Sequence, residues 1–352
     1  MKNQLLLIFI SCLFAQTLNA QYMDMGRKLK AFHQATEVYV ILDSEDPKLI
    51  EKWQKKNETK AIENYREFIS VYNENLLSNI QKYWPYKQTV VGKTEAEISK
   101  LGGNAVVIYI LHHALGTGYN TAQNYSGPQV FTNLNFKFSE NAPESTAKCL
   151  SVYTEPDDSK NGIVSYKNYN SLIIELADDF FGHEGMICEI GLTHQLPEET
   201  DIKFAMQFSK YFIDLLTTDP DPKNFEPQEI GGMEDVKNYT IAVNERHVDS
   251  EMTSESLNSI FGLSMELMNE VAYDEIVLNG KQNYAYIMTS VSVPMHVGYP
   301  VCIFVDAVTG DIIAMAYFNK SDRKIAAEYM MENSVSVLSA KLLRLASYDL
   351  KE

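Results

Sequence analysis

The residues best suited to chemistry form two short motifs in the first half of the chain. His112 and His113 follow an apolar run, and His183 and Glu184 stand together in the stretch DDFFGHEG. Imidazole and carboxylate groups can ligate a metal ion or serve as acid and base in hydrolysis. One hypothesis is therefore a hydrolase whose site joins the loop at residues 112–125 to the second motif.

The spacing of these motifs does not favour a metal site. The stretch HEGMIC is not HExxH, so no second histidine follows Glu184 by one helical turn. Neighbouring residues of a strand point to opposite faces, so only one of His112 and His113 could take part. We therefore expect neither a metal nor a cofactor. The simpler interpretation of His183 is a partly buried histidine that is hydrogen-bonded within a loop.

The stretch at residues 112–128 is a second kind of candidate. It is rich in glycine, asparagine and tyrosine, and it is longer than a simple connection requires. Loops of this length often carry function. Tyr119 and Tyr125 could line a surface for a sugar or a peptide, although ordinary aromatic packing is the simpler interpretation.

Sequence motifs for other chemistries are absent. No GxxxxGK[ST] or GxGxxG opens a helix, and no GxSxG nucleophile elbow is present. Beyond the N-terminal segment the cysteines are Cys149, Cys188 and Cys302, so at most one internal disulfide can form. The best pair is Cys149 with Cys188, but the simpler interpretation is three buried thiols. These absences favour a protein that is not an enzyme.

Composition excludes two classes of partner. The chain has 30 lysine and arginine residues against 47 aspartate and glutamate residues, a formal net charge of −17. Nucleic acids and anionic membrane surfaces both require positive charge on the protein, so neither is expected as a partner. Apart from the N-terminal segment, no apolar stretch is long enough for a transmembrane helix. The oligomeric state does not follow from the sequence.

The first 20 residues have the features of a secretory signal peptide. Lys2 supplies a positive start, Leu5–Phe14 an apolar run, and Ala20 a small residue before the expected cut at Gln21. We therefore expect export to the periplasm, with release outside the cell as an alternative. Lipid attachment through Cys12 is a further alternative, but the apolar run continues beyond that cysteine.

A proline-rich stretch divides the remaining chain. Pro220, Pro222 and Pro227 fix φ and lack an N–H donor, so no regular element is expected to run through them. We predict a signal peptide, a first α/β unit with insertions, a linker and a second α/β unit at residues 1–20, 21–217, 218–238 and 239–352.

Hydrophobic periodicity and turn residues predict the elements. Apolar runs predict strands at residues 36–42, 88–91, 105–111, 130–138, 148–153, 171–177, 239–244, 274–278, 284–293, 301–305 and 311–318. Helical spacing predicts helices at residues 23–34, 47–55, 59–83, 95–101, 197–216, 253–271 and 323–347. Residues 178–193 fit no single pattern. The turn at residues 306–310 predicts a β-hairpin, because Asp306 can accept from turn amides and Gly310 can take a positive φ.

The order of elements predicts the fold class. Each unit opens with a strand, a long helix and a short strand, and then has several strands and a closing helix. This order indicates an α/β protein (α+β is possible) made of two related mixed-sheet units with long covering helices, with a possible tandem duplication. The leading functional hypothesis is an exported, non-enzymatic module that binds a ligand or a protein. Its candidate ligand-binding residues are His112, His113, Tyr119, Tyr125, His183 and Glu184.

Overall fold

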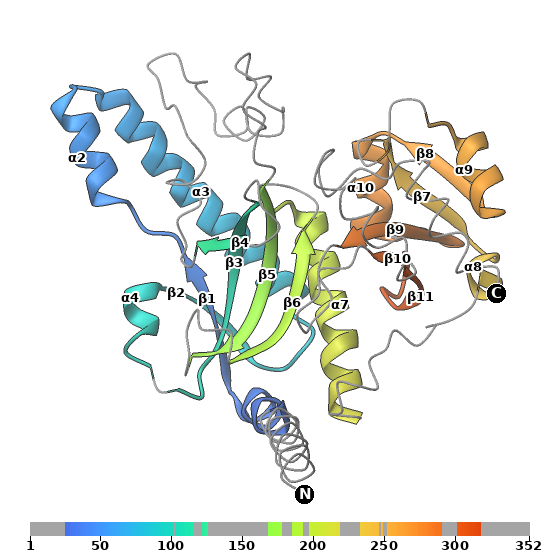
Figure 1. The fold of residues 1–352 in the computed structure, drawn as a ribbon, viewed down its shortest axis with the longest axis horizontal. Coiled ribbons are helices and arrows are strands. Elements are labelled where there is room, and N and C mark those ends of the chain that lie inside the picture. Colours follow the sequence, from blue (N-terminus) through green and yellow to red (C-terminus); the bar gives the residue numbers. More distant parts are fainter. Residues whose placement is uncertain are drawn as a thin grey trace, which may run out of the picture.

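The chain folds into two β-sheets with helices packed against them (Figure 1). The strands of one sheet, here sheet A, precede residue 219 in the chain, and those of the other, sheet B, follow residue 232. The computed structural model describes residues 25–101, 103–115, 122–125, 168–177, 185–192, 197–218, 233–245, 248, 252–290 and 301–317.

Sheet A is mixed and has six strands. They are β1 (Glu37–Leu42), β2 (Thr89–Thr94), β3 (Val106–Leu115), β4 (Ala122–Tyr125), β5 (Asn168–Leu176) and β6 (Met186–Leu192). Their order is β2-β1-β3-β5-β6, with β4 paired to β3 outside this series. Strand β1 runs parallel to β2 and β3, whereas the β3–β5 and β5–β6 pairs are antiparallel.

Sheet B repeats this arrangement with five strands. They are β7 (Thr240–Asn244), β8 (Ser264–Met268), β9 (Tyr284–Ser290), β10 (Val301–Asp306) and β11 (Ile312–Tyr317). Their order is β8-β7-β9-β10-β11; β7 runs parallel to β8 and β9, and the remaining pairs are antiparallel. Each strand of sheet B thus matches a strand of sheet A in order and direction. The prediction of two related mixed-sheet units is confirmed.

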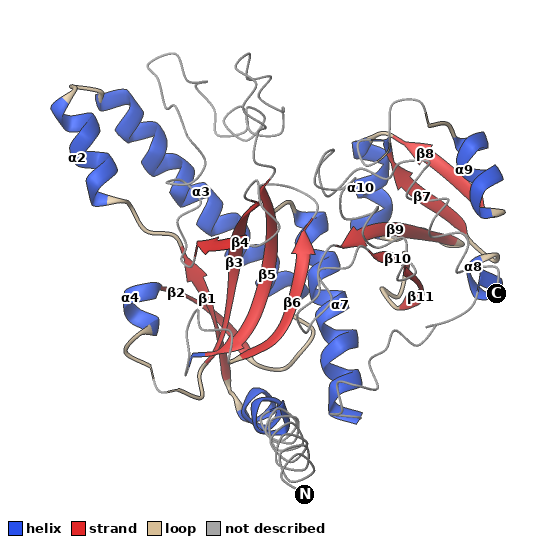
Figure 2. Ribbon diagram, in the orientation of Figure 1, coloured by secondary structure: helices blue, strands red, loops and turns tan. Residues whose placement is uncertain are grey.

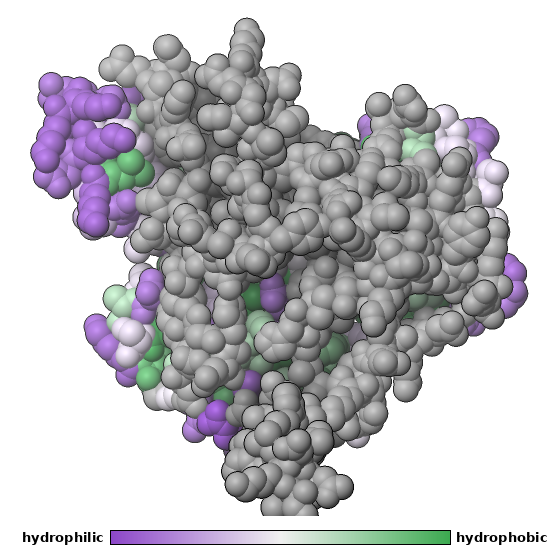
Figure 3. Space-filling view, viewed as in Figure 1, coloured by the Kyte–Doolittle hydropathy of each residue, from purple (hydrophilic) through white to green (hydrophobic). Residues whose placement is uncertain are grey.

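Helices cover the sheets, as Figure 2 shows by colour. Residues 25–34 are helical. The labelled helices are α2 (Pro47–Lys55), α3 (Thr59–Tyr83), α4 (Glu95–Ile98), α7 (Glu199–Thr218), α8 (Met233–Val236), α9 (Ser254–Phe261) and α10 (Glu270–Asn279). In α3 the apolar residues recur every three or four positions, so one stripe of the helix is buried against sheet A. The opposite side is polar, and the α2–α3 end is hydrophilic on the face in Figure 3.

Helix α7 belongs to the first unit in sequence but packs against both sheets. Its buried side chains, such as Phe204, share one hydrophobic cluster with α3, with sheet A and with one face of sheet B. Polar contacts reinforce this position: Lys203 Nζ donates to the carbonyl oxygen of Val277 in α10, and the Tyr286 hydroxyl of β9 donates to Gln207 Oε1. In Figure 1 the helix lies between the two sheets.

The segment after β7 differs from its prediction. One helix was expected at residues 253–271 and a strand at residues 274–278, but the structure has α9, then β8, then α10. Gly262 ends α9 in the left-handed conformation at φ 66°, and Asn269 caps α10 by accepting from the Ala272 amide. The prediction was wrong because β8 carries Leu267 and Met268 at positions that also fit a helical stripe.

Residues 112–128 are not simply a loop. Strand β3 continues through His112 and His113 to Leu115, and β4 pairs with this extension. The unassigned residues 178–193 contain β6, whose pairing with β5 includes a bulge. In both places the strand pairs antiparallel with the strand just before it in the chain, and this pairing, rather than the periodicity of the segment itself, defines it.

The predicted hairpin is confirmed. Strands β10 and β11 are antiparallel, and Asp306 Oδ1 accepts from the amides of Val308 and Thr309, both at 2.8 Å. Gly310 has φ 75°, which a residue with a side chain rarely adopts.

The remaining predictions concern the cysteines, membrane spans and segments outside the described residues. Cys188 and Cys302 are free, buried thiols, whereas Cys149 lies outside the described residues. None of the described helices is long and apolar enough to cross a membrane. The predicted signal peptide, most of the linker, two strands and the last helix also lie outside the described residues, at positions 1–20, 219–232, 130–138, 148–153 and 323–347.

Candidate functional site

Strands β1 and β3 are parallel neighbours, so both end at one edge of sheet A, here called the carboxyl edge. The connections change direction at β1, which has β2 on one side and β3 on the other. Helix α3 follows β1 and packs on one face, whereas Ile98 of α4, which follows β2, packs on the opposite face. In α/β sheets such a reversal at the carboxyl ends of strands is the usual place for a ligand.

Strand β4 takes the place of β1 beside β3 at this edge. Because β5 occupies one side of β3, strands β1 and β4 share the other side. The pairing with β1 reaches Ile108, and the pairing with β4 begins at His112, which lies opposite Tyr125. The structure thus brings three of the predicted residues, His112, His113 and Tyr125, to the carboxyl edge.

Asp43 is the first residue after β1 and is buried at the same edge, with 5% of its surface exposed. The Asn73 side chain on α3 holds its backbone: the Asp43 amide donates to Asn73 Oδ1, and Asn73 Nδ2 donates to the Asp43 carbonyl, both at 2.9 Å. The carboxyl oxygen Oδ2 has no hydrogen-bond partner among the described residues. Such an atom is rare in folded proteins and calls for a physical explanation.

Burial controls the ionisation of this group. It raises the pKa of Asp43 well above its ordinary value, because the charged form loses its solvation. Burial also raises the pKa values of Tyr65 and Tyr72 on α3, and the charge of Asp43 adds to both shifts. The Tyr65 hydroxyl accepts from the Asp46 amide at 3.0 Å and so fixes the turn that follows Asp43. Asp43 therefore keeps its proton at pH values where an exposed aspartate has lost it.

A neutral carboxyl group can donate one hydrogen bond and accept others, so Asp43 can hold a group that carries an N–H or O–H. Asp43 is not among the residues predicted from the sequence, because residues 43–47 have the pattern of a turn and helix start. The property that matters is burial by α3, whose residue Asn73 is 30 positions away. The feature of the sequence that could have indicated Asp43 is its position as an acidic residue directly after a buried strand.

The structure does not describe the positions of the other predicted site residues. Tyr119, His183 and Glu184 themselves lie outside the described part. The segment at residues 178–184 begins after β5 and ends before β6. Its flanks are anchored at the opposite edge, the amino edge, where the Ala177 amide donates to the Ala105 carbonyl at 2.8 Å. The described flanks of the second motif are thus at the amino edge, whereas His112 and His113 are at the carboxyl edge.

No metal centre is formed by the described residues, in which no group of three or more His, Cys, Asp and Glu side chains is placed to hold an ion. His183 and Glu184 fall outside that search, so the expectation of no metal stays a prediction.

Comparison with known proteins identifies no family and no relative. No protein-family model matches the chain, and neither the curated proteins nor the solved structures contain a match.

Proposed function

We propose that this chain is an exported binding module that holds a small polar ligand at the carboxyl edge of sheet A. The observation that carries the proposal is Asp43 Oδ2, a buried carboxyl oxygen that lacks a hydrogen-bond partner among the described residues. An amine or a hydroxyl group of a ligand would supply that partner. His112 and Tyr125 lie at the same edge and are the nearest of the predicted residues in the sheet register.

Binding is favoured over the alternative of hydrolysis for a geometric reason. A hydrolase needs an acid, a base and donors for the developing charge within reach of one reacting atom. The described residues attach His112 to the carboxyl edge and both flanks of residues 178–184 to the amino edge. Asp43 supplies a buried proton donor at the carboxyl edge, and a buried donor of this kind suits recognition of a ligand.

The export part of the proposal is supported by the pattern of residues 1–20. It is tested by expressing the full chain with a C-terminal tag in a two-membrane bacterium and fractionating the cells. We expect the tagged protein in the periplasmic fraction with Gln21 as its first residue, as read by mass spectrometry. Recovery of the uncut chain from the cytoplasm contradicts export.

The ligand proposal is tested by a thermal-shift screen of residues 21–352 with amines, amino acids and sugars. We expect a hit to raise the melting temperature of the unmodified protein and to bind Asp43→Asn about 10-fold more weakly. Asp311→Asn, which changes an exposed aspartate directly before β11, is the matched control and should retain binding. Equal affinity for Asp43→Asn, or no hit in any class, contradicts a ligand site at Asp43.

A further inference from the structure

A second concave surface lies at the amino edge of sheet A. The helix at residues 25–34 leads into β1, and Asn104 lies two residues before β3, so the parallel pair brings these segments together. Between them is a cavity of about 240 Å³. Its lining residues, here called the amino-edge pocket, are Arg27, Lys30, Ala31, Gln34, Ala35 and Asn104.

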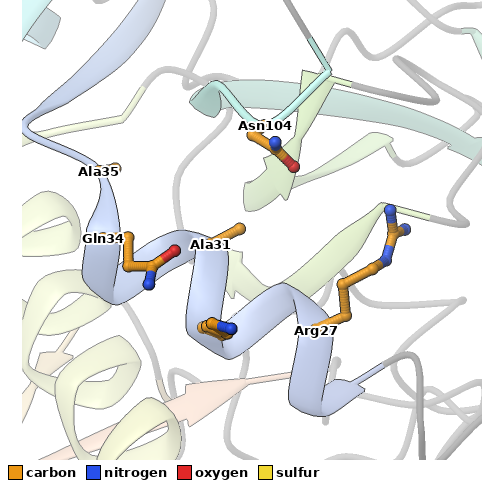
Figure 4. Close-up of a pocket in the computed structure, with 6 residues that line it drawn as sticks. Arg27, Ala31, Gln34, Ala35 and Asn104 are labelled. Carbon is orange, nitrogen blue, oxygen red and sulfur yellow. The ribbon is translucent and has the colours of Figure 1, made fainter.

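The polar groups of the amino-edge pocket are mainly hydrogen-bond donors. Arg27 and Lys30 are cations, and the amides of Gln34 and Asn104 each offer an NH₂ group. Figure 4 shows Arg27 and Gln34 toward opposite ends of the helical segment, with Asn104 across from Ala31. Arg27 and Gln34 are about 10 Å apart along the helix axis, since each residue adds about 1.5 Å. Ala31, which lies between these two positions, adds only a methyl group to the lining.

The local charge contrasts with that of the whole protein. The chain carries a formal net charge of −17, yet residues 25–36 contain no aspartate or glutamate and include Arg27, Lys28 and Lys30. Lys28 is buried on the neighbouring side of the helix, where its Nζ lies 3.5 Å from the Met186 carbonyl. A concave surface with one sign of charge concentrates ions of the opposite sign.

We propose that the amino-edge pocket binds a small oxyanion, either a carboxylate or a phosphate. A planar guanidinium forms paired hydrogen bonds with the oxygens of both groups, and an ammonium adds a point charge. The volume lies below the about 300 Å³ at which pockets for drug-sized ligands begin, so the occupant is a compact anion. The site is independent of Asp43, because β1 separates the two edges by about 20 Å.

The test is isothermal titration of residues 21–352, at constant ionic strength, with inorganic phosphate, succinate and the uncharged analogue succinamide. We expect saturable binding of one or both oxyanions and none of the diamide. The double variant Arg27→Gln/Lys30→Gln should bind at least about 10-fold more weakly. Both side chains are exposed, and the melting temperature of the variant, compared with that of the parent, shows whether it is folded. Phosphate and succinate are titrated separately, so the preferred oxyanion is read directly.

The matched control is Lys48→Gln/Lys52→Gln, which removes the same charge from exposed positions on α2. It should retain oxyanion binding. An equal loss in both double variants attributes the effect to net charge and overturns the pocket. Absence of saturable binding at about 10 mM of either anion also overturns it. Neither result bears on the Asp43 site, which is tested with Asp43→Asn.

Discussion

At the scale of single residues, Asp43 shows how burial rather than sequence context sets a chemical property. An aspartate beside Ser44, Glu45 and Asp46 would ordinarily be a solvated turn residue. Here Asn73 of α3 holds its backbone, the side chain is buried, and burial raises its pKa well above the ordinary value. The same residue also provides the clearest pH-dependent prediction for this protein.

The folded state holds a proton on Asp43 that the unfolded chain releases above about pH 3.9. The stabilisation that this group adds to the folded state is therefore fully present below that pH. It is lost as the pH rises through the raised folded-state pKa. We expect Asp43→Asn, which stays neutral, to gain stability relative to the parent as the pH rises. Urea denaturation at about pH 4 and about pH 8 measures this difference. An unchanged difference between the two pH values contradicts the pKa shift.

Gly310 and Gly262 form a second residue-scale comparison, because both have a positive φ, 75° and 66°. A Cβ added at Gly262 would meet nothing within 4 Å, whereas a Cβ added at Gly310 would overlap Gln207 Nε2. We expect Gly262→Ala to cost about 1 kcal/mol from the backbone alone. Gly310→Ala should cost about 1–3 kcal/mol more, because Gln207 must move away from the Tyr286 hydroxyl.

Denaturation of the two alanine variants measures this difference, and a double-mutant cycle assigns it. In the background of Gln207→Ala the extra cost of Gly310→Ala should disappear. Equal costs for the two glycine variants in the parent would show that the contact with Gln207 carries no energy.

At the scale of elements, helix caps decide how the segment after β7 is divided. A continuous apolar stripe favoured one helix at residues 253–271, but Gly262 and Asn269 provide an end and a new start. The division frees residues 264–268 to pair with β7 as β8, which completes sheet B at its edge. Short capping residues therefore outweigh periodicity in this segment.

The cap at Asn269 gives an element-scale prediction. Asn269 Oδ1 accepts from the Ala272 amide at 3.0 Å, which satisfies a donor in the first turn of α10. We expect Asn269→Ala to destabilise the protein by about 1 kcal/mol, and Asn269→Ser to restore most of that loss. Thermal or urea denaturation compares the three proteins. If serine is no better than alanine, the amide contact does not stabilise α10.

At the scale of the whole molecule, α7 joins the two sheets through a shared hydrophobic cluster. The largest hydrophobic cluster runs from residue 25 to residue 315 and includes both faces of the contact made by α7. Lys203 and Gln207 add hydrogen bonds from α7 to α10 and β9. A shared apolar core of this kind couples units that a proline-rich stretch would otherwise leave independent.

The two buried thiols test this coupling. Cys188 lies in β6 of sheet A and Cys302 in β10 of sheet B, and both are free. We expect both to become reactive at the same urea concentration, as in one cooperative transition. Thiol labelling followed by peptide mass spectrometry distinguishes each cysteine. Exposure of Cys302 at a lower urea concentration than Cys188 would mean that the sheets unfold separately.

The sequence alone determined the elements whose signals are local. The bounds of α3, the strand β1 and the hairpin turn after Asp306 follow from apolar spacing and from turn chemistry within a few residues. The order of these elements was enough to predict two related units. Export is likewise predicted by a contiguous pattern at residues 1–20.

Only the tertiary structure decided what distant segments do together. The contact of Asp43 with Asn73 of α3 and the meeting of Arg27 with Asn104 each join residues far apart in the chain. A local sequence pattern shows whether a residue is apolar or charged, but it does not show which distant residues bury it. Helix α3 contacts Asp43, and the parallel pairing of β1 with β3 brings the segments of Arg27 and Asn104 together. Both candidate sites therefore depend on contacts between distant segments.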